Sequence, residues 1–194
     1  SICYYEHTSH PEKNRQLAEE ALASSRQIKY TKGEGYAQRY LALYHWTKGN
    51  YEIAASHAFE MLRVFETSAN SVGISKAYAV LGLIHDEWGD FDKSKEYFTK
   101  SMEINEKANR IYDLAYNLNS LGSLHHRFSK YDEAEQYYLK SLELRKQIKD
   151  EDGISQSYNN LAQIAKVRKD YTKATEYILN TVAIAKKFNN KNRL

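Results

Sequence analysis

Apolar side chains recur three and four residues apart along most of the chain, which is the spacing of one face of an α-helix and differs from the alternation of a β-strand. Leu81 and Ile84 lie on one face of a predicted helix, the pair Gly89 and Asp90 interrupts the pattern, and a second helix begins at Phe91. The same pattern predicts four helix pairs: 34–48 with 51–67, 71–88 with 91–108, 111–128 with 131–149, and 153–168 with 171–188. Residues 11–29 match a further second helix, and residues 1–8 match the end of a first helix.

The pattern has a period of forty residues and no insertion. One column holds leucine: Leu41, Leu81, Leu121 and Leu161. A second column, ten residues further on, is aromatic: Tyr51, Phe91, Tyr131 and Tyr171. Such a period is typical of a solenoid, in which each unit buries its apolar face against its neighbours. We therefore predict one all-α solenoid domain over 1–194, with a partial repeat at 1–30 and full repeats at 31–70, 71–110, 111–150 and 151–190.

These columns resemble the tetratricopeptide repeat (TPR) family, whose loose consensus is W-x2-L-G-x2-Y followed by A-x3-F. The second repeat matches it with Tyr78, Leu81, Gly82, His85, Ser94 and Phe98. The family's usual unit is about six residues shorter than this one and ends in a proline, which is absent here. The chain is therefore similar to the long-unit branch, found in peptide-binding adaptors and in sensory regions of bacterial signalling proteins. The resemblance implies an α-α superhelix, a right-handed solenoid of antiparallel helix pairs.

Composition narrows the function classes. The formal net charge of +3 is too small to indicate a nucleic-acid or membrane-surface partner, and no apolar run approaches the length of a membrane span. The single cysteine, Cys3, favours a reducing, cytoplasmic setting. Seventeen tyrosines fit a protein rich in interfaces, because a tyrosine can pack its ring while its hydroxyl reaches water or a ligand.

The ends of helices carry their own signals. Asp90 suits an N-cap, and Asn50 and Asp170 stand in the same column, whereas Lys130 breaks it. The last predicted helix has an apolar run at 182–185, together with Leu179 and Phe188, where a terminal repeat should be polar. We therefore expect self-association through this helix, or a further segment packed on it, and a chain that is a fragment of a longer protein.

By the TPR resemblance, the first helix of each pair lines a concave groove that holds a peptide or a partner helix. The implied groove residues are Tyr36, Arg39, Tyr40, Leu43, Trp46, Lys76, Ala79, Leu83, Asp86, Glu87, Tyr116, Asn119, Ser123, His126, Arg127, Gln156, Asn159, Asn160, Gln163 and Lys166. Asn119, Asn159 and Asn160 draw attention because a carboxamide both donates to and accepts from an extended peptide. The alternative for each asparagine is a solvated helix face.

No metal, cofactor or catalytic arrangement is predicted. His45, His85 and His125 form a column, but neighbouring helix axes lie about 8–10 Å apart, whereas ligands sit near 2 Å from zinc. These histidines also occupy the packing-tyrosine position of the TPR consensus. The pair Asp86 and Glu87 is better explained as an ion network than as a catalytic dyad.

We thus predict a protein- or peptide-binding scaffold that is not an enzyme. The alternative is a sensory or dimerisation region of a larger signalling protein, such as a histidine kinase, a nucleotide cyclase or a transcription regulator. A third reading, a free-standing phosphatase on this scaffold, has no residue that supports it.

Overall fold

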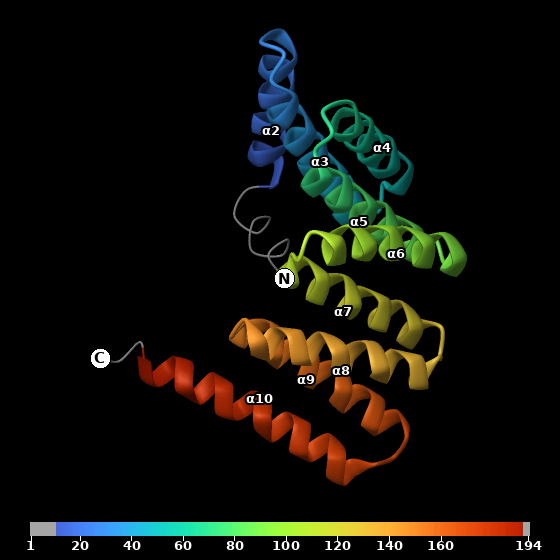
Figure 1. The fold of residues 1–194 in the computed structure, drawn as a ribbon, viewed down its shortest axis with the longest axis vertical. Helices are drawn as coiled ribbons and strands as arrows, with labels where there is room; N and C mark the ends of the chain where they lie inside the picture. The colour runs from blue at the N-terminus through green and yellow to red at the C-terminus, as the bar shows by residue number, and fades with distance from the viewer. Residues whose placement is uncertain (1–10, 192–194) are drawn as a thin grey trace. The chain divides into compact units, whose positions relative to one another are not determined.

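A computed structural model describes residues 11–191 of the chain, with side chains up to residue 186. Over this range, nine α-helices follow one another without a β-strand (Figure 1). They are α2 (Pro11–Gln27), α3 (Thr31–Thr47), α4 (Tyr51–Thr67), α5 (Ser71–Glu87), α6 (Phe91–Lys107), α7 (Ile111–Arg127), α8 (Tyr131–Gln147), α9 (Glu151–Val167) and α10 (Tyr171–Lys191). The predicted helices match these closely, and the one expected at 1–8 lies outside the described residues.

The two first helices expected at 34 and 153 begin earlier, at Thr31 and Glu151. The earlier start of α9 has a local cause. The carboxylate of Asp150 accepts a hydrogen bond from the backbone N–H of Gly153 at 3.0 Å, which caps the helix. Asn70 caps α5 in the same way, with a 2.9 Å bond from the backbone N–H of Gly73. Neither cap was predicted.

Of the predicted caps before second helices, Asp90 and Asp170 are confirmed. Their carboxylates accept from the backbone N–H groups of Lys93 at 3.1 Å and Lys173 at 3.0 Å. Asn50 occupies the N-cap position of α4, but its side chain makes no capping hydrogen bond, so that prediction was wrong. The backbone angle ψ is 63° at Asn50, whereas it is an extended 90° at Asn70, whose side chain does cap its helix.

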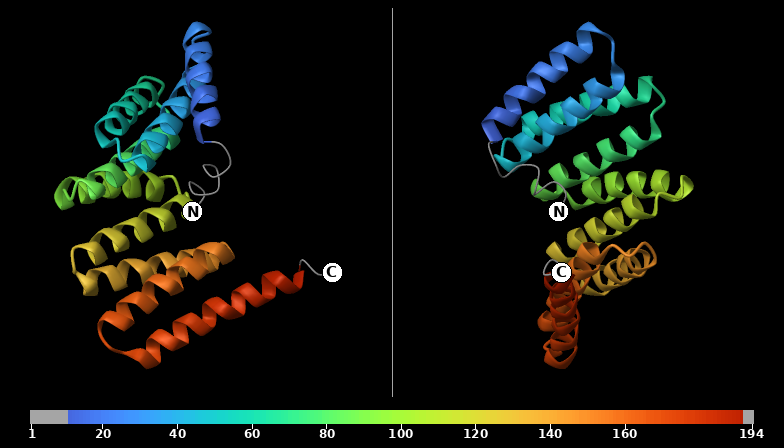
Figure 2. Two further views of the ribbon diagram at one scale, coloured as in Figure 1. Left: turned by 180° about the vertical axis from the view of Figure 1, so that it is seen from behind. Right: turned by 90° about the vertical axis from the view of Figure 1, so that its left-hand side faces the viewer.

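The chain divides into two compact units, residues 1–104 and 105–194. In unit 1, α3 packs against α2, α4 and α5 (Figure 2). Two apolar clusters fill the space between α3, α4 and α5. Their buried members are Ala42, Leu43, Ala54, Ala55, Ala58, Val80, Leu81 and Ile84 in one cluster and Met61, Phe65 and Ala77 in the other. The repeated leucine and small-residue columns thus supply the core, because small side chains let helices approach closely.

In unit 2, α7 packs against α8 and α9, and α9 packs against α8 and α10. The buried members of its core cluster are Ala134, Tyr138, Leu142, Leu161 and Ile164. Buried hydroxyls satisfy main-chain carbonyls in both units. Ser141 donates to the carbonyl of Ala115 at 2.8 Å, and in unit 1 Ser101 donates to the carbonyl of Ser75 at 2.7 Å. Ser101 and Ser141 stand one period apart, so the same buried hydrogen bond recurs in both units.

Candidate functional site

The first helices of unit 1, α3 and α5, lie side by side and carry half of the predicted groove residues. Tyr36 is half-buried and meets the ring of Phe65 edge-on, with centroids 5.6 Å apart. Arg39, Tyr40 and Trp46 are also half-buried, and Trp46 packs against the core cluster. These side chains form a partly packed aromatic surface on α3.

Two predicted residues of this face are buried: Leu43 belongs to the core cluster and is 3% exposed, and Asp86 is 9% exposed. The remaining residues that α5 contributes are half-buried, namely Lys76, Ala79, Leu83 and Glu87. The face of unit 1 therefore presents fewer side chains to a ligand than the repeat columns suggested.

The first helices of unit 2, α7 and α9, bring two of the predicted asparagines together. The Nδ2 atom of Asn160 donates a 2.9 Å hydrogen bond to Oδ1 of Asn119, which is itself buried. Asn159 differs from both: it is exposed, and its Oδ1 accepts from the hydroxyl of Thr181 in α10 at 3.3 Å. The three amides thus do not form one ladder, and only Asn119 and Asn160 act as a pair.

The other predicted residues of unit 2 surround this pair with varied exposure. Tyr116, Ser123, His126 and Gln156 are half-buried, and Arg127, Gln163 and Lys166 are exposed. Two of the half-buried side chains accept hydrogen bonds from residues of α8. The hydroxyl of Tyr138 donates to Oγ of Ser123 at 3.2 Å, and Arg145 donates to Oε1 of Gln156 at 3.1 Å.

The histidine column lies in helix interfaces. His85 and His125 are buried, and half-buried His45 stacks on His57 with centroids 5.5 Å apart. Burial lowers the pKa of His85, although Nδ1 of His85 lies 3.6 Å from the carboxylate of Asp90. Across the described residues, no group of three or more His, Cys, Asp or Glu side chains could hold a metal ion.

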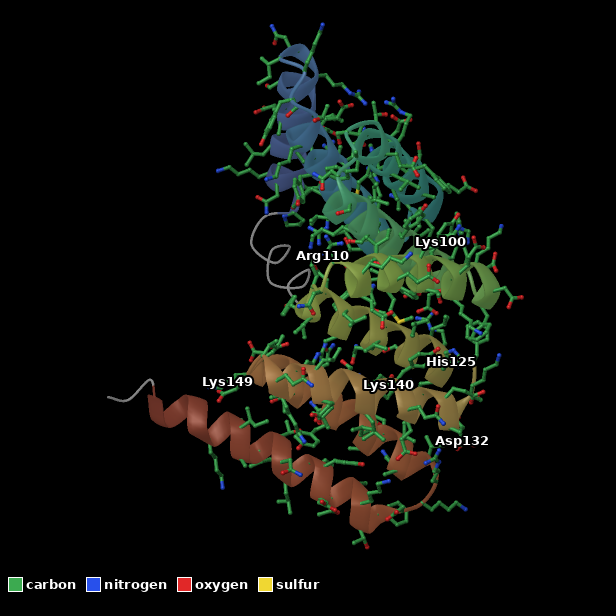
Figure 3. All side chains as sticks on the ribbon, in the orientation of Figure 1. Lys100, Arg110, His125, Asp132, Lys140 and Lys149 are labelled. Carbon is green, nitrogen blue, oxygen red and sulfur yellow. The ribbon has the colours of Figure 1, made fainter. Side chains whose placement is uncertain are left out.

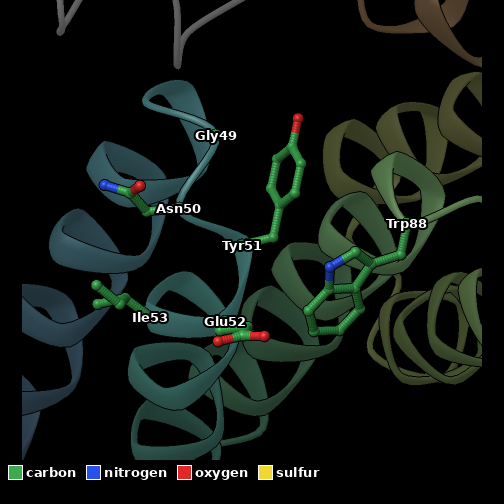
Figure 4. Close-up of a pocket in the computed structure, with 6 residues that line it drawn as sticks. All are labelled: Gly49, Asn50, Tyr51, Glu52, Ile53 and Trp88. Carbon is green, nitrogen blue, oxygen red and sulfur yellow. The ribbon is translucent and has the colours of Figure 1, made fainter.

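A surface hollow of about 350 Å³ lies at the turn between α3 and α4 in unit 1 (Figure 4), and none of its lining residues is among the predicted groove residues. It is lined by Gly49, Asn50, Tyr51, Glu52, Ile53 and Trp88. Trp88 follows α5 and is 45% exposed, and Ile53 is 48% exposed. We call this the Trp88 hollow. Sequence reasoning missed it, although one signal existed: Trp88 stands where the other full repeats carry Lys48, Phe128 and Arg168.

Comparison with known families decides the classification. Residues 75–107 and 113–187 both match family models described as tetratricopeptide repeat. The chain belongs to the TPR family. TPR units are typically non-catalytic and serve as scaffolds for protein–protein interaction. No curated protein sequence matches the chain significantly.

Solved structures agree on the fold. The chain is similar to BtubC (BKLC) from P. vanneervenii, with a TM-score of 0.80 and 21% identity over 91% of this chain and 74% of that one. It is similar to the apo form of RapI, with a TM-score of 0.74 and 16% identity over 91% of this chain and 51% of that one. For aspartyl phosphate phosphatase F from Bacillus subtilis the TM-score is 0.67, with 16% identity over 94% of this chain and 56% of that one.

At these identities the likeness shows the fold alone, and it confirms the predicted all-α, TPR-like superhelical repeat. The chain spans about half the length of two of these structures. Assignment to the long-unit branch stays a prediction. None of the helices between residues 11 and 191 is both long and apolar enough to cross a membrane.

Proposed function

We propose that this TPR chain binds a protein or peptide segment on its first-helix faces, with the α7 and α9 face of unit 2 as the principal contact. The observation that carries the proposal is the hydrogen bond between Asn160 and Asn119. It uses one N–H of Asn160 and Oδ1 of the buried Asn119, so half-buried Asn160 still offers its Oδ1 and its second N–H to a ligand. Neither group has another hydrogen-bond partner among the described residues.

An amide that is already oriented loses less conformational freedom when a ligand binds, which favours affinity. Gln163 and Lys166 extend the same helix toward its C-terminal end and are exposed. The predicted residues of this face include Arg127 and Lys166 and no carboxylate, which favours an acidic or mixed ligand through charge complementarity. The surface thus combines amides for a peptide backbone with basic groups for its side chains.

The test compares two neighbouring asparagines. A randomised peptide library is selected on the wild-type protein, and the affinity of the best peptide is measured by calorimetry. Asn160→Ala should weaken binding by about two- to ten-fold, the worth of one hydrogen bond. Asn159→Ala removes an exposed amide that faces Thr181 and should leave the affinity unchanged. Equal effects of the two substitutions, or none from Asn160→Ala, would refute the proposal.

A second role, self-association as part of a larger regulatory protein, is favoured by helix α10. Its exposed apolar side chains Ile178, Leu179 and Val182 have exposed fractions of 50%, 62% and 40%. The predicted surface extended to Phe188, whose side chain lies outside the described set. If a second copy of the chain covers this face, Leu179→Glu should lower the molar mass measured by light scattering, whereas Leu139→Glu on α8 should not.

A further inference from the structure

A recurring ion pair joins the turn after one first helix to the start of the preceding second helix. After α3, Nζ of Lys48 lies 3.4 Å from the carboxylate of Glu12 in the first turn of α2. After α9, the guanidinium of Arg168 pairs with the carboxylate of Asp132 in the first turn of α8. Asp132 lies beside the turn between α7 and α8 (Figure 3). In sequence, Glu12 and Asp132 are separated by three periods, so the two pairs occupy equivalent places.

The cations at these places have further partners. The ammonium of Lys48 lies 5.6 Å from the centroid of the Tyr44 ring, within the range of a cation–π interaction. Arg168 also pairs with Glu135. At both places a carboxylate thus holds a basic side chain, with an aromatic ring or a second carboxylate beside it.

After the other two first helices the corresponding residue is not basic: Trp88 follows α5 and Phe128 follows α7. Glu52 stands one period after Glu12, but the residue after α5 is Trp88 instead of a cation. Glu52 is exposed and has no hydrogen-bond or ion-pair partner in the described part of the chain. Lys48, four residues before Glu52, pairs with Glu12, and Lys93, five residues after Trp88, lies 3.6 Å from the carboxylate of Asp90.

After α5, the place of the missing cation is the Trp88 hollow. The carboxylate of Glu52, the ring of Tyr51 and the indole of Trp88 line the same space (Figure 4). An indole face is the strongest natural partner for a cation among aromatic side chains, and an adjacent carboxylate adds a Coulombic attraction. The hollow therefore supplies the two kinds of contact that hold Lys48 on Tyr44 and Glu12.

We propose that the Trp88 hollow binds an arginine or lysine side chain of a partner protein, in the place that Lys48 and Arg168 fill from within the chain at the equivalent steps. The hollow lies at the turns between helices and uses none of the first-helix face residues. The inference is therefore independent of the proposed role of Asn160.

The experiment titrates the folded protein with an acetylated Ala-Arg-Ala amide and follows the backbone amide resonance of Gly49, which lines the hollow, by NMR. The matched peptide carries glutamine in place of arginine. We expect a saturable shift of the Gly49 resonance with the arginine peptide and none with the glutamine peptide. The affinity should fall as salt is added, because an exposed charge pair is screened.

Three variants sharpen the outcome. Glu52→Gln should weaken the arginine peptide by about three-fold, whereas Glu66→Gln, at an exposed site on the same helix, should not. Trp88→Arg supplies the missing cation from within the chain and should abolish binding of the peptide. Three results would overturn the inference: no saturable shift, an equal response to the glutamine peptide, or equal effects of Glu52→Gln and Glu66→Gln.

Discussion

Phe65 is the largest fully buried side chain of its core cluster in unit 1. It lies in α4, is 0% exposed, and packs between α3 and α5. A Cβ placed on Gly35 would come 2.3 Å from its ring, and one placed on Gly73 would come 2.1 Å from it. The ring thus fills the space that these two glycines leave, and Tyr36 closes one side. Phe65→Ala should lower the free energy of unfolding by about 3–5 kcal/mol, the cost of emptying such a site.

The contact between Gly73 and the Phe65 ring gives a second prediction, in which the effect of one substitution depends on the other. Gly73→Ala in the wild-type protein should destabilise unit 1, because the new methyl group overlaps the Phe65 ring. In the Phe65→Ala background the overlap disappears, and replacing a helical glycine should then stabilise the fold by about 0.5–1 kcal/mol. The sign of the Gly73→Ala effect therefore reverses between the two backgrounds.

Chemical denaturation followed by circular dichroism measures all four proteins of this cycle. Phe59→Ala is the matched control, since Phe59 lies on the same helix but is 46% exposed, and it should cost less than about 1 kcal/mol. A loss from Phe65→Ala no greater than that from Phe59→Ala would refute the packing argument. So would a Gly73→Ala effect of the same sign in both backgrounds, because contacting residues must couple.

Three further outcomes follow from single contacts. Asn70→Ala should cost about 1 kcal/mol of unfolding free energy through loss of its cap, whereas Asn50→Ala, which removes no capping bond, should cost almost nothing; equal costs would contradict the assignment of the caps. Arg168→Ala should cost less than about 1 kcal/mol at low salt and still less at high salt, because the guanidinium is partly exposed; a salt-independent loss would argue against an ion pair. Since burial lowers the pKa of His85, the unfolded chain binds this proton more readily. The stability that neutral His85 contributes should be complete above about pH 6.5 and lost as the pH falls through its lowered pKa, and a His85→Gln variant with an equally steep denaturation profile would contradict this.

The helices and their packing columns could be predicted because the information is local. The three- and four-residue spacing around Leu81 and Leu121 predicts which side each helix buries, and both leucines are 0% exposed. The N-caps were harder to predict from the sequence, because Asn50 and Asn70 have the same side chain and differ in the backbone angle at the turn. The candidate site was predicted less completely. The sequence indicated three asparagines, and only the structure shows that Asn160 bonds to Asn119 while Asn159 faces Thr181.

The sequence by itself determined that this protein is a helical repeat, because each repeat contacts its neighbours through the same apolar columns and a fixed period repeats those contacts. It also determined which residues differ between repeats, such as Trp88 where two other repeats have the basic residues Lys48 and Arg168. Only the tertiary structure decided which polar groups meet, since contacts such as those of Asn160 with Asn119 and of Arg168 with Asp132 join different helices. Such contacts depend on the offset between neighbouring helices in three dimensions, which no pattern along a single helix contains.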